Sequence, residues 1–192
     1  DRDLGTPMPR ALLLSALFSL LALPGLASDG IATEGKLSDK DFFRLATCGA
    51  TPGGDCDGPV VRWPQPNISL ALAAPNRRYP AALAAKVSVA LDRAIAEING
   101  AGGDIHITRD DRLTEPDIIV SLPALSEGDP TRGIPRIPNG QPIGVGFMWL
   151  WWDENAEITA ASMLISDDIK EIDLPSVVLE ELYQCLGFLY DI

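Results

Sequence analysis

The sequence predicts one α+β domain in which a mixed or antiparallel sheet packs against a long helix and a C-terminal helix. Residues 80–100 repeat apolar positions every three or four residues, as one buried face of a helix does. Residues 104–122 and 146–166 contain short runs rich in β-branched and aromatic residues, which favour strands. Residues 174–186 return to the helical spacing, and a length of 192 residues fits a single domain.

The first 27 residues are expected to lie outside this domain. Residues 1–7 precede the first methionine and are interpreted as upstream translation. Residues 8–27 have the form of a secretory signal peptide, with Arg10 in a positive start, an apolar run of 13 residues, and the small residue Ala27 for cleavage. A membrane span needs about 20 apolar residues, which disfavours an uncleaved anchor. We therefore expect a secreted or periplasmic protein whose single domain, residues 28–192, has no membrane span after signal cleavage.

The first half of the domain is expected to contain a short helix, two strands and the long helix. The strands are predicted around Val60–Trp63 and at Ile68–Ala73, with prolines between them. The long helix begins near Pro80, which suits a first turn, and Asn99-Gly100 provides a left-handed stop. Its buried face is predicted to consist of Leu83, Val87, Leu91, Ile95 and Ile98.

The second half is expected to complete the sheet. "DIHITRD" and "PDIIVSL" have the pattern of strands, and a Pro/Gly-rich connection without periodicity follows from Pro123 to Gly146. "GFMWLWW" and residues 158–166 then predict a β-hairpin. The first strand of the hairpin is apolar on both faces, which indicates a central strand covered on both sides. Core packing is the preferred interpretation of its tryptophans, and a platform for sugars or peptides is the alternative.

The charge balance argues against nucleic acid as a partner. The chain has 15 Lys and Arg against 27 Asp and Glu, which gives a net charge of −12. Removal of residues 1–27 takes away two residues of each sign, so the domain keeps this charge. Non-specific nucleic-acid binding depends on Lys and Arg that neutralise phosphates, and no basic stripe is present.

The cysteines agree with export. Cys48 and Cys56 flank the flexible segment "GATPGGD" and are predicted to form a disulfide in an oxidising compartment. A metal pair is disfavoured because the spacing is not CxxC and no histidine or second cysteine pair is near. Cys185 falls on the apolar face of the last helix, so we expect a buried free thiol there and not a nucleophile.

The last helix has the rhythm of the zinc-peptidase motif HExxHxxGxxH without its histidines. Glu180 and Gln184 are one turn apart, as the two histidines of HExxH must be to reach one ion. Glu181 takes the position of the carboxylate that deprotonates the metal-bound water. Gly187 falls at the glycine that bends the chain out of the helix, and Tyr190 stands at the third histidine. A helical projection places Glu180, Glu181 and Gln184 on a polar patch opposite the apolar face.

Two segments carry a resemblance to a known family. "EELYQCLGFLYD" and "DFFRLATCGATPGGDCDGPVVRW" resemble domain-of-unknown-function family 2927, a family of exported bacterial proteins, over about residues 38–192. The family's helix is similar to zincin active-site helices, so the resemblance implies a zincin-like α+β domain. The usual "GLxND" ending of the family is "GFLYD" here, so Tyr190 departs from the pattern. The resemblance also implies a further downstream part, and we expect the domain to be truncated after Ile192.

The donor atoms of this helix do not suit zinc. Glu180, Gln184 and Asp191, the candidate metal or ligand-binding residues, supply only oxygens, whereas catalytic zinc prefers nitrogen and sulfur with at most one carboxylate. If an ion binds, we expect a hard divalent cation such as Ca²⁺ or Mg²⁺; no cofactor is predicted. A structural alternative is that Glu180 and Gln184 simply hydrogen-bond to each other along the helix.

Three functions follow in order of preference. The first is an exported, non-peptidase, zincin-like binding domain of the cell envelope, with an extended peptide or envelope protein as its partner. The second is a hydrolase that uses an oxygen-ligated metal or a carboxylate pair, with Glu181 as the catalytic general base. The third is a structural envelope protein whose cleft is idle.

Overall fold

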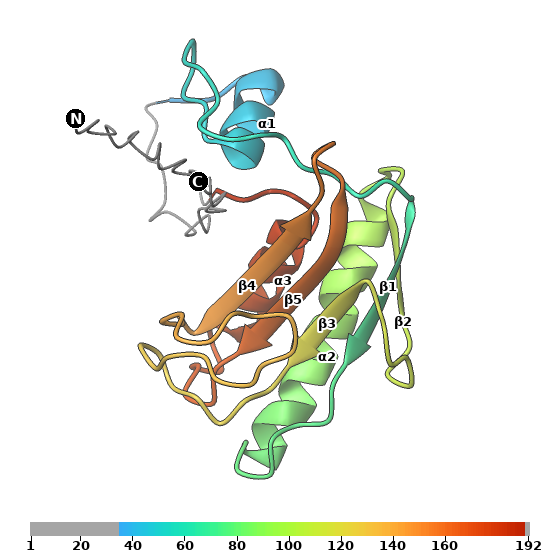
Figure 1. Ribbon diagram of the computed structural model, residues 1–192, viewed down its shortest axis with the longest axis vertical. Coiled ribbons are helices and arrows are strands. Elements are labelled where there is room, and N and C mark those ends of the chain that lie inside the picture. Colours follow the sequence, from blue (N-terminus) through green and yellow to red (C-terminus); the bar gives the residue numbers. More distant parts are fainter. Residues whose placement is uncertain (1–34, 191–192) are drawn as a thin grey trace, which may run out of the picture.

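The structure, a computed structural model, describes residues 35–190 as a layered α+β domain (Figure 1). The upstream residues 1–7, the predicted signal peptide 8–27 and the candidate ligand Asp191 lie outside the described residues. The elements in chain order are α1 (Asp39–Cys48), β1 (Asn67–Leu72), α2 (Ala81–Gly100), β2 (His106–Arg109), β3 (Ile118–Ser121), β4 (Gly146–Trp152), β5 (Ile158–Ile165) and α3 (Leu174–Gln184).

The five strands form one mixed sheet in the order β2-β1-β3-β5-β4. Four strands run parallel, because β1 pairs in parallel with β2 and β3, and β3 pairs in parallel with β5. Only β4 runs antiparallel, along β5. Parallel neighbours need a crossover connection, and the long helix α2 provides it between β1 and β2. The α+β class with a mixed sheet is therefore confirmed.

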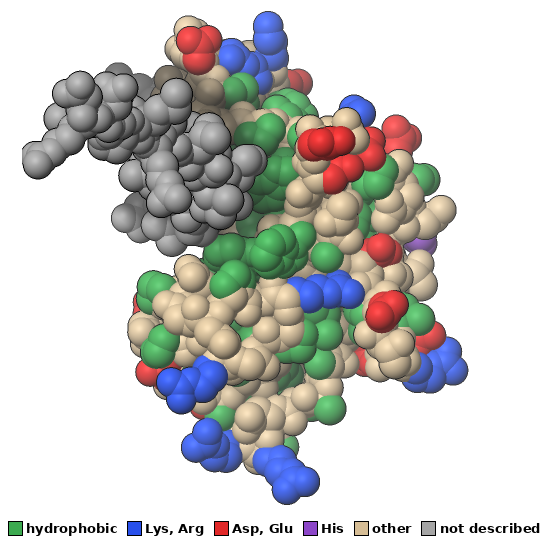
Figure 2. All heavy atoms as spheres, viewed as in Figure 1, with side chains coloured by type: hydrophobic (Ala, Val, Ile, Leu, Met, Phe, Trp, Pro, Cys, Tyr) green, Lys and Arg blue, Asp and Glu red, His purple; other side chains and the backbone are tan. Residues whose placement is uncertain are grey.

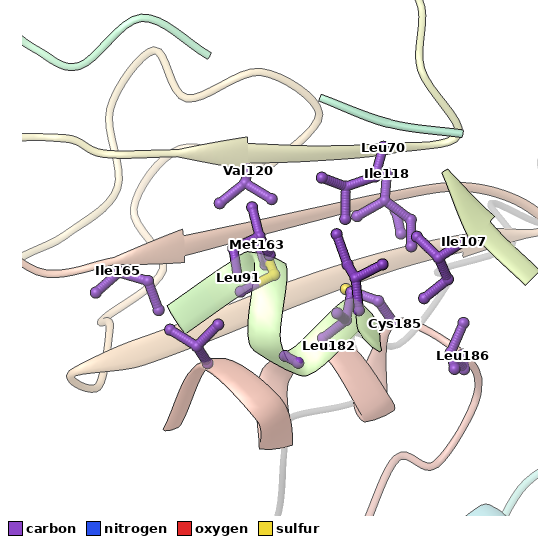
Figure 3. Close-up of a cluster of buried hydrophobic side chains, with 14 of the residues drawn as sticks. Leu70, Leu91, Ile107, Ile118, Val120, Met163, Ile165, Leu182, Cys185 and Leu186 are labelled. Atoms are coloured by element: carbon purple, nitrogen blue, oxygen red, sulfur yellow. The ribbon is translucent and has the colours of Figure 1, made fainter. Parts of the chain in front are cut away.

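Helices α2 and α3 cover one face of the sheet and enclose the main core (Figure 1). Leu91 from α2 and Leu182 from α3 are fully buried and point toward the strand residues Leu70, Ile118 and Met163 (Figure 3). Of the predicted buried face of the long helix, Val87, Leu91, Ile95 and Ile98 are buried, and Leu83 packs against the core from a partly buried position. The helical periodicity thus identified the face correctly.

The connection between β3 and β4 covers the opposite face of the sheet. Ile137 and Ile143 from this connection form a second buried cluster with Leu164 of β5, and Phe147 and Trp149 of β4 pack against it. Both faces of β4 are therefore covered near its start, as predicted. The prediction that this strand is central was wrong, because β4 lies at the edge of the sheet. An apolar pattern on both faces reports what lies above and below a strand, and not what lies beside it.

Two local predictions also need correction. Val60–Trp63 forms no strand: Arg62 makes a single bridge to Glu157, with its N–H donating to the Ala156 carbonyl at 3.1 Å. Prolines on both sides of "VVRW" limit backbone pairing because they lack an N–H donor. The long helix does end at Gly100, but Gly100 does not supply the left-handed residue; a positive φ of +79° occurs at Gly102.

Candidate functional site

The candidate site lies on α3, which packs against both α2 and the sheet. Val178, Leu182 and Cys185 are fully buried and fix the helix on the core. The three polar residues that the sequence grouped as one patch have different surroundings: Glu180 is exposed, whereas Glu181 and Gln184 are only 9% and 6% exposed. Each of the three takes part in an interaction within the chain. Two of the three residues of the predicted polar patch, Glu181 and Gln184, are therefore buried beside the apolar face of α3, and only Glu180 faces solvent.

Glu181 lies against the first residue of the edge strand β4. A Cβ atom built on Gly146 would be 2.5 Å from Glu181 Oε1 and 2.6 Å from Val177 Cγ1, closer than packed atoms tolerate. The lack of a side chain at Gly146 therefore allows α3 to approach β4 closely enough for the carboxylate to lie beside the strand backbone. This proximity connects the predicted catalytic residue with the edge of the sheet.

Cys185 follows Glu181 by one helical turn and is a free thiol, fully buried as predicted. Burial raises the pKa of this thiol well above its usual value, and the nearby Glu181 carboxylate raises the pKa further. A thiol that stays protonated is a poor nucleophile and a poor metal ligand. The assignment of Cys185 to packing is consistent with these surroundings.

The end of α3 is held by the segment that follows the disulfide loop. The indole N–H of Trp63 donates to the backbone carbonyl of Cys185 at 2.9 Å, which satisfies one of the last carbonyls of the helix. Gly187 has a φ of +104°, and a Cβ on it would collide with the carbonyl oxygen of Val61. The glycine of the EExxQxxG pattern is thus required by backbone conformation and packing at this helix end.

Tyr190, which stands at the third histidine of the zinc-peptidase pattern, is held by α1. Its backbone N–H donates to the Ala46 carbonyl at 3.1 Å, and its ring lies so close to Gly49 that a Cβ there would be 2.7 Å from Cε1. Burial and the Asp57 carboxylate raise the pKa of the Tyr190 phenol. These contacts anchor the tyrosine to the N-terminal part of the domain.

The predicted disulfide between Cys48 and Cys56 is present. It closes the loop that follows α1, where Gly49 caps the helix in a left-handed conformation and the N–H of Asp57 donates to the Cys48 carbonyl at 2.8 Å. Arg44 also donates from its guanidinium to the Gly54 carbonyl at 2.8 Å. The loop against which Tyr190 packs is therefore fixed by covalent and hydrogen bonds.

The donor set on α3 does not fit a zinc ion. Glu180 and Gln184 offer oxygens only, whereas catalytic zinc prefers nitrogen and sulfur ligands with at most one carboxylate. Within residues 35–190 no group of three or more His, Cys, Asp or Glu side chains is arranged to hold a metal ion. His106, the one histidine of the chain, is exposed on the edge strand β2.

One feature of the structure had no counterpart in the sequence analysis. An open cavity of about 410 Å³ lies where the chain leaves β1 and β3, and Arg78, Arg132 and Ser121 line it. These residues are distant in sequence and belong to no motif. The available signal was the Pro/Gly-rich connection after Pro123, which is long enough to suggest a functional loop.

Comparison of the chain with models of known protein families and with curated protein sequences yields no match. Among residues 35–190, no helix has the length and apolar character that crossing a membrane requires.

Proposed function

We propose that this domain is an exported, zincin-like binding domain that takes up an extended peptide along the outer edge of β4 and does not cleave it. The observation that carries this proposal is the position of β4. It is the one antiparallel strand, it lies at the edge of the sheet, and it passes beside the buried carboxylate of Glu181.

An edge strand can add a peptide as a further strand because every second residue turns its N–H and C=O groups outward. The two edges of this sheet differ in this respect. At β2, the side chain of Asn99 accepts from the N–H of Ile107 at 2.8 Å and donates to the Ile107 carbonyl at 2.9 Å. β2 is also only four residues long, whereas β4 has seven. β4 is thus the longer edge and the one better suited to accept a peptide.

Exposed apolar side chains near the end of β4 offer a surface that a bound peptide would remove from water. Trp151 and Trp152 are 46% and 39% exposed, although both are large and apolar. The indole N–H of Trp151 donates a hydrogen bond to the backbone carbonyl of Arg136 at 2.9 Å, which holds the ring in place. Held aromatic rings offer contact area at low entropic cost, which is typical of binding surfaces.

The segments "DFFRLATCGATPGGDCDGPVVRW" and "EELYQCLGFLYD" resemble a family whose last helix is similar to zincin active-site helices. This resemblance supports a zincin-like assignment, because zincin-type domains place their motif helix beside such an edge strand. The absence of nitrogen donors at the motif positions supports a domain without zinc-peptidase activity. The disulfide, which persists in oxidising compartments, and the signal-like residues 8–27 support export to the periplasm or the exterior.

Selection from a random heptapeptide library, followed by hydrogen exchange with the best synthetic peptide, tests this function. We expect the peptide to protect amides of residues 146–152 and to leave those of residues 106–109 unchanged. Methylation of alternate backbone nitrogens of the same peptide should abolish binding, because strand addition depends on main-chain hydrogen bonds. Protection elsewhere, or equal binding by the methylated peptide, would contradict strand addition at β4.

Hydrolysis with Glu181 as the general base is the second candidate, favoured by the burial of this carboxylate beside β4. Mass spectrometry of the bound peptide, with and without Mg²⁺ or Ca²⁺, separates the two functions. A binding domain returns the peptide intact. Cleavage that is lost in Glu181→Gln while peptide binding persists would establish the hydrolase instead.

A further inference from the structure

The cavity near Ser121 occupies the position in the sheet where ligands of open α/β proteins commonly bind. From β1 the chain turns through α2 to β2 on one side, and from β3 it continues to β4 and β5 on the other. The strand order thus reverses between β1 and β3, and the crevice beyond their carboxyl ends is the usual ligand site at such a switch point. The cavity is built from the residues that follow these two strands and from residues 132–135 of the long connection.

Two arginines give this cavity a positive character within an acidic protein. Arg78 follows β1, Arg132 belongs to the long connection, and neither guanidinium has an ion-pair partner among residues 35–190. Arg109 and Arg112, by contrast, are paired with aspartates. Lys and Arg side chains are visible at the lower end of the molecule, where β1 leads into α2 (Figures 1 and 2).

Carboxylates do not neutralise the cavity. The described residues that line it include no Asp or Glu. Asp167 and Asp168 lie on the neighbouring turn after β5, where they accept from the Ser126 hydroxyl at 3.1 Å and from the Glu127 N–H at 3.2 Å. Both arginines are exposed at the opening of the cavity, where an anion can accept charge-assisted hydrogen bonds from their guanidinium groups.

Ser121 lies at the wall of the cavity. Successive side chains of a strand point to opposite faces of the sheet, and Ile118 and Val120 of β3 point into the main core. Ser121 therefore points to the other face, which the long connection covers. Ser121 is 6% exposed, and its hydroxyl has no hydrogen-bond partner among the described residues. The hydroxyl oxygen is closed to solvent, so it adds a polar group just beneath the wall of the cavity and does not itself project into the open space.

The rest of the wall is apolar. Leu122 and Pro123 are buried, and Leu125 and Ile134 are partly buried around the cavity. The volume of about 410 Å³ lies within the range of small-molecule sites, about 300–1,000 Å³. A few convergent polar groups in an apolar cavity favour a ligand with one charged end and one apolar end.

We propose that this cavity binds a small amphipathic anion, with its carboxylate or phosphate head at Arg78 and Arg132 and its apolar part against Leu125 and Ile134. This site is separate from the peptide edge at β4, so the two proposals stand or fall independently.

Titration of the full chain with hexanoate, hexyl phosphate and the uncharged hexanol tests this site by ¹H–¹⁵N spectra. We expect saturable shifts at the amides of Leu122 and Gly133 with at least one of the two anions. Whichever anion binds identifies the head group that the site prefers. Hexanol should bind at least about tenfold more weakly, because charge-assisted hydrogen bonds supply much of the affinity.

Matched arginine variants locate the site. Arg78→Gln combined with Arg132→Gln should weaken the anion at least about tenfold, whereas Arg77→Gln, which removes an exposed charge outside the cavity, should leave the affinity within about twofold. Thermal unfolding of each variant confirms that it is folded. Undiminished binding by the double variant, equal affinity for hexanol, or no saturable shift with either anion would overturn the proposal.

Discussion

At Gly187 the chain leaves α3 with a φ of +104° and passes against the carbonyl oxygen of Val61. A side chain at this position meets two obstacles, an unfavourable backbone conformation and a fixed backbone atom. Close to this contact, the Trp63 indole N–H donates to the backbone carbonyl of Cys185. This hydrogen bond ties the segment of Val61 to the end of α3, so the two backbones cannot easily move apart. At the scale of single residues, the glycine of the motif is explained by packing.

Substitution of Gly187 by alanine should therefore destabilise the domain by about 2 kcal/mol or more. Gly100→Ala is the matched control, because Gly100 ends α2 with open space around its Cα, and alanine there should be neutral or stabilise by up to about 1 kcal/mol. Urea unfolding at neutral pH measures both free energies of unfolding. Equal stability of the two variants would contradict the contact with Val61.

Cys185 should be unreactive toward a thiol reagent such as DTNB in the folded protein at pH 8, because burial and Glu181 raise the pKa of the thiol. In urea above the unfolding transition, one thiol per chain should react promptly. Reaction of the native protein at the rate of the unfolded one would show that the thiol is accessible. Cys185→Ala, which removes the only free cysteine of the described residues, is the control for labelling at the disulfide.

At the scale of elements, α1 depends on the loop that follows it. The helix is short, begins at the Ser38 cap, and ends at Gly49 immediately before the loop closed by Cys48 and Cys56. Its last turn is buried and also accepts the N–H of Tyr190. The disulfide therefore stabilises the surface to which the C-terminal segment attaches.

Reduction of this disulfide should lower the free energy of unfolding by about 2–3 kcal/mol, as expected for a short closed loop. Urea unfolding with and without dithiothreitol measures the change. A Cys48→Ser/Cys56→Ser variant has no bridge to reduce, so dithiothreitol should leave its unfolding curve unchanged. A native protein equally insensitive to dithiothreitol would exclude a stabilising role for the disulfide.

The elements most accurately predicted from the sequence are those with strong local periodicity. The spacing of Val87, Leu91 and Ile95 determines a helix face, and the hairpin of β4 and β5 follows from two adjacent β-rich runs. The edge position of β4 and the bridge at Arg62 were missed, because neighbours within a sheet are set by long-range pairing that no local pattern records. The cavity arginines were missed for the same reason.

The polar residues of α3 show a different limit of sequence analysis. A helical projection separates Glu181 and Gln184 from the apolar face, yet both are buried. The projection assumes that only one side of a helix is covered. α3 contacts α2, β4 and β5, and Gly146 allows β4 to approach the margin of the helix, so the covered arc is wider than one apolar stripe.

At the scale of the whole molecule, the segment around the disulfide loop, residues 41–63, and the end of the chain from Glu180 to Tyr190 form one structural unit. Trp63 bonds to the end of α3, the N–H of Tyr190 bonds to α1, and Phe43 meets Phe188 edge to face with ring centroids 6.3 Å apart. The segments are more than a hundred residues apart in sequence. Their combination marks a shared packing surface next to the candidate site, which a motif search on either segment alone does not reveal.

Tyr79 links distant parts of the fold and should make global stability sensitive to alkaline pH. Tyr79 lies just before α2 and is buried, and its phenol donates to the backbone carbonyl of Ser166, after β5, at 3.1 Å. Burial, and to a smaller extent the nearby Asp167 carboxylate, raises the pKa of this phenol. Above about pH 10 the Tyr79 phenol is deprotonated in the unfolded chain but still protonated in the folded protein. The free energy of unfolding, which is at its full value below pH 10, therefore falls as the pH rises further, by up to about 1.4 kcal/mol per pH unit. Tyr79→Phe should be about 1 kcal/mol less stable at pH 7 but should decline less steeply above pH 10. Urea unfolding from pH 7 to 11 measures both slopes, and parallel curves for the two proteins would contradict the coupling.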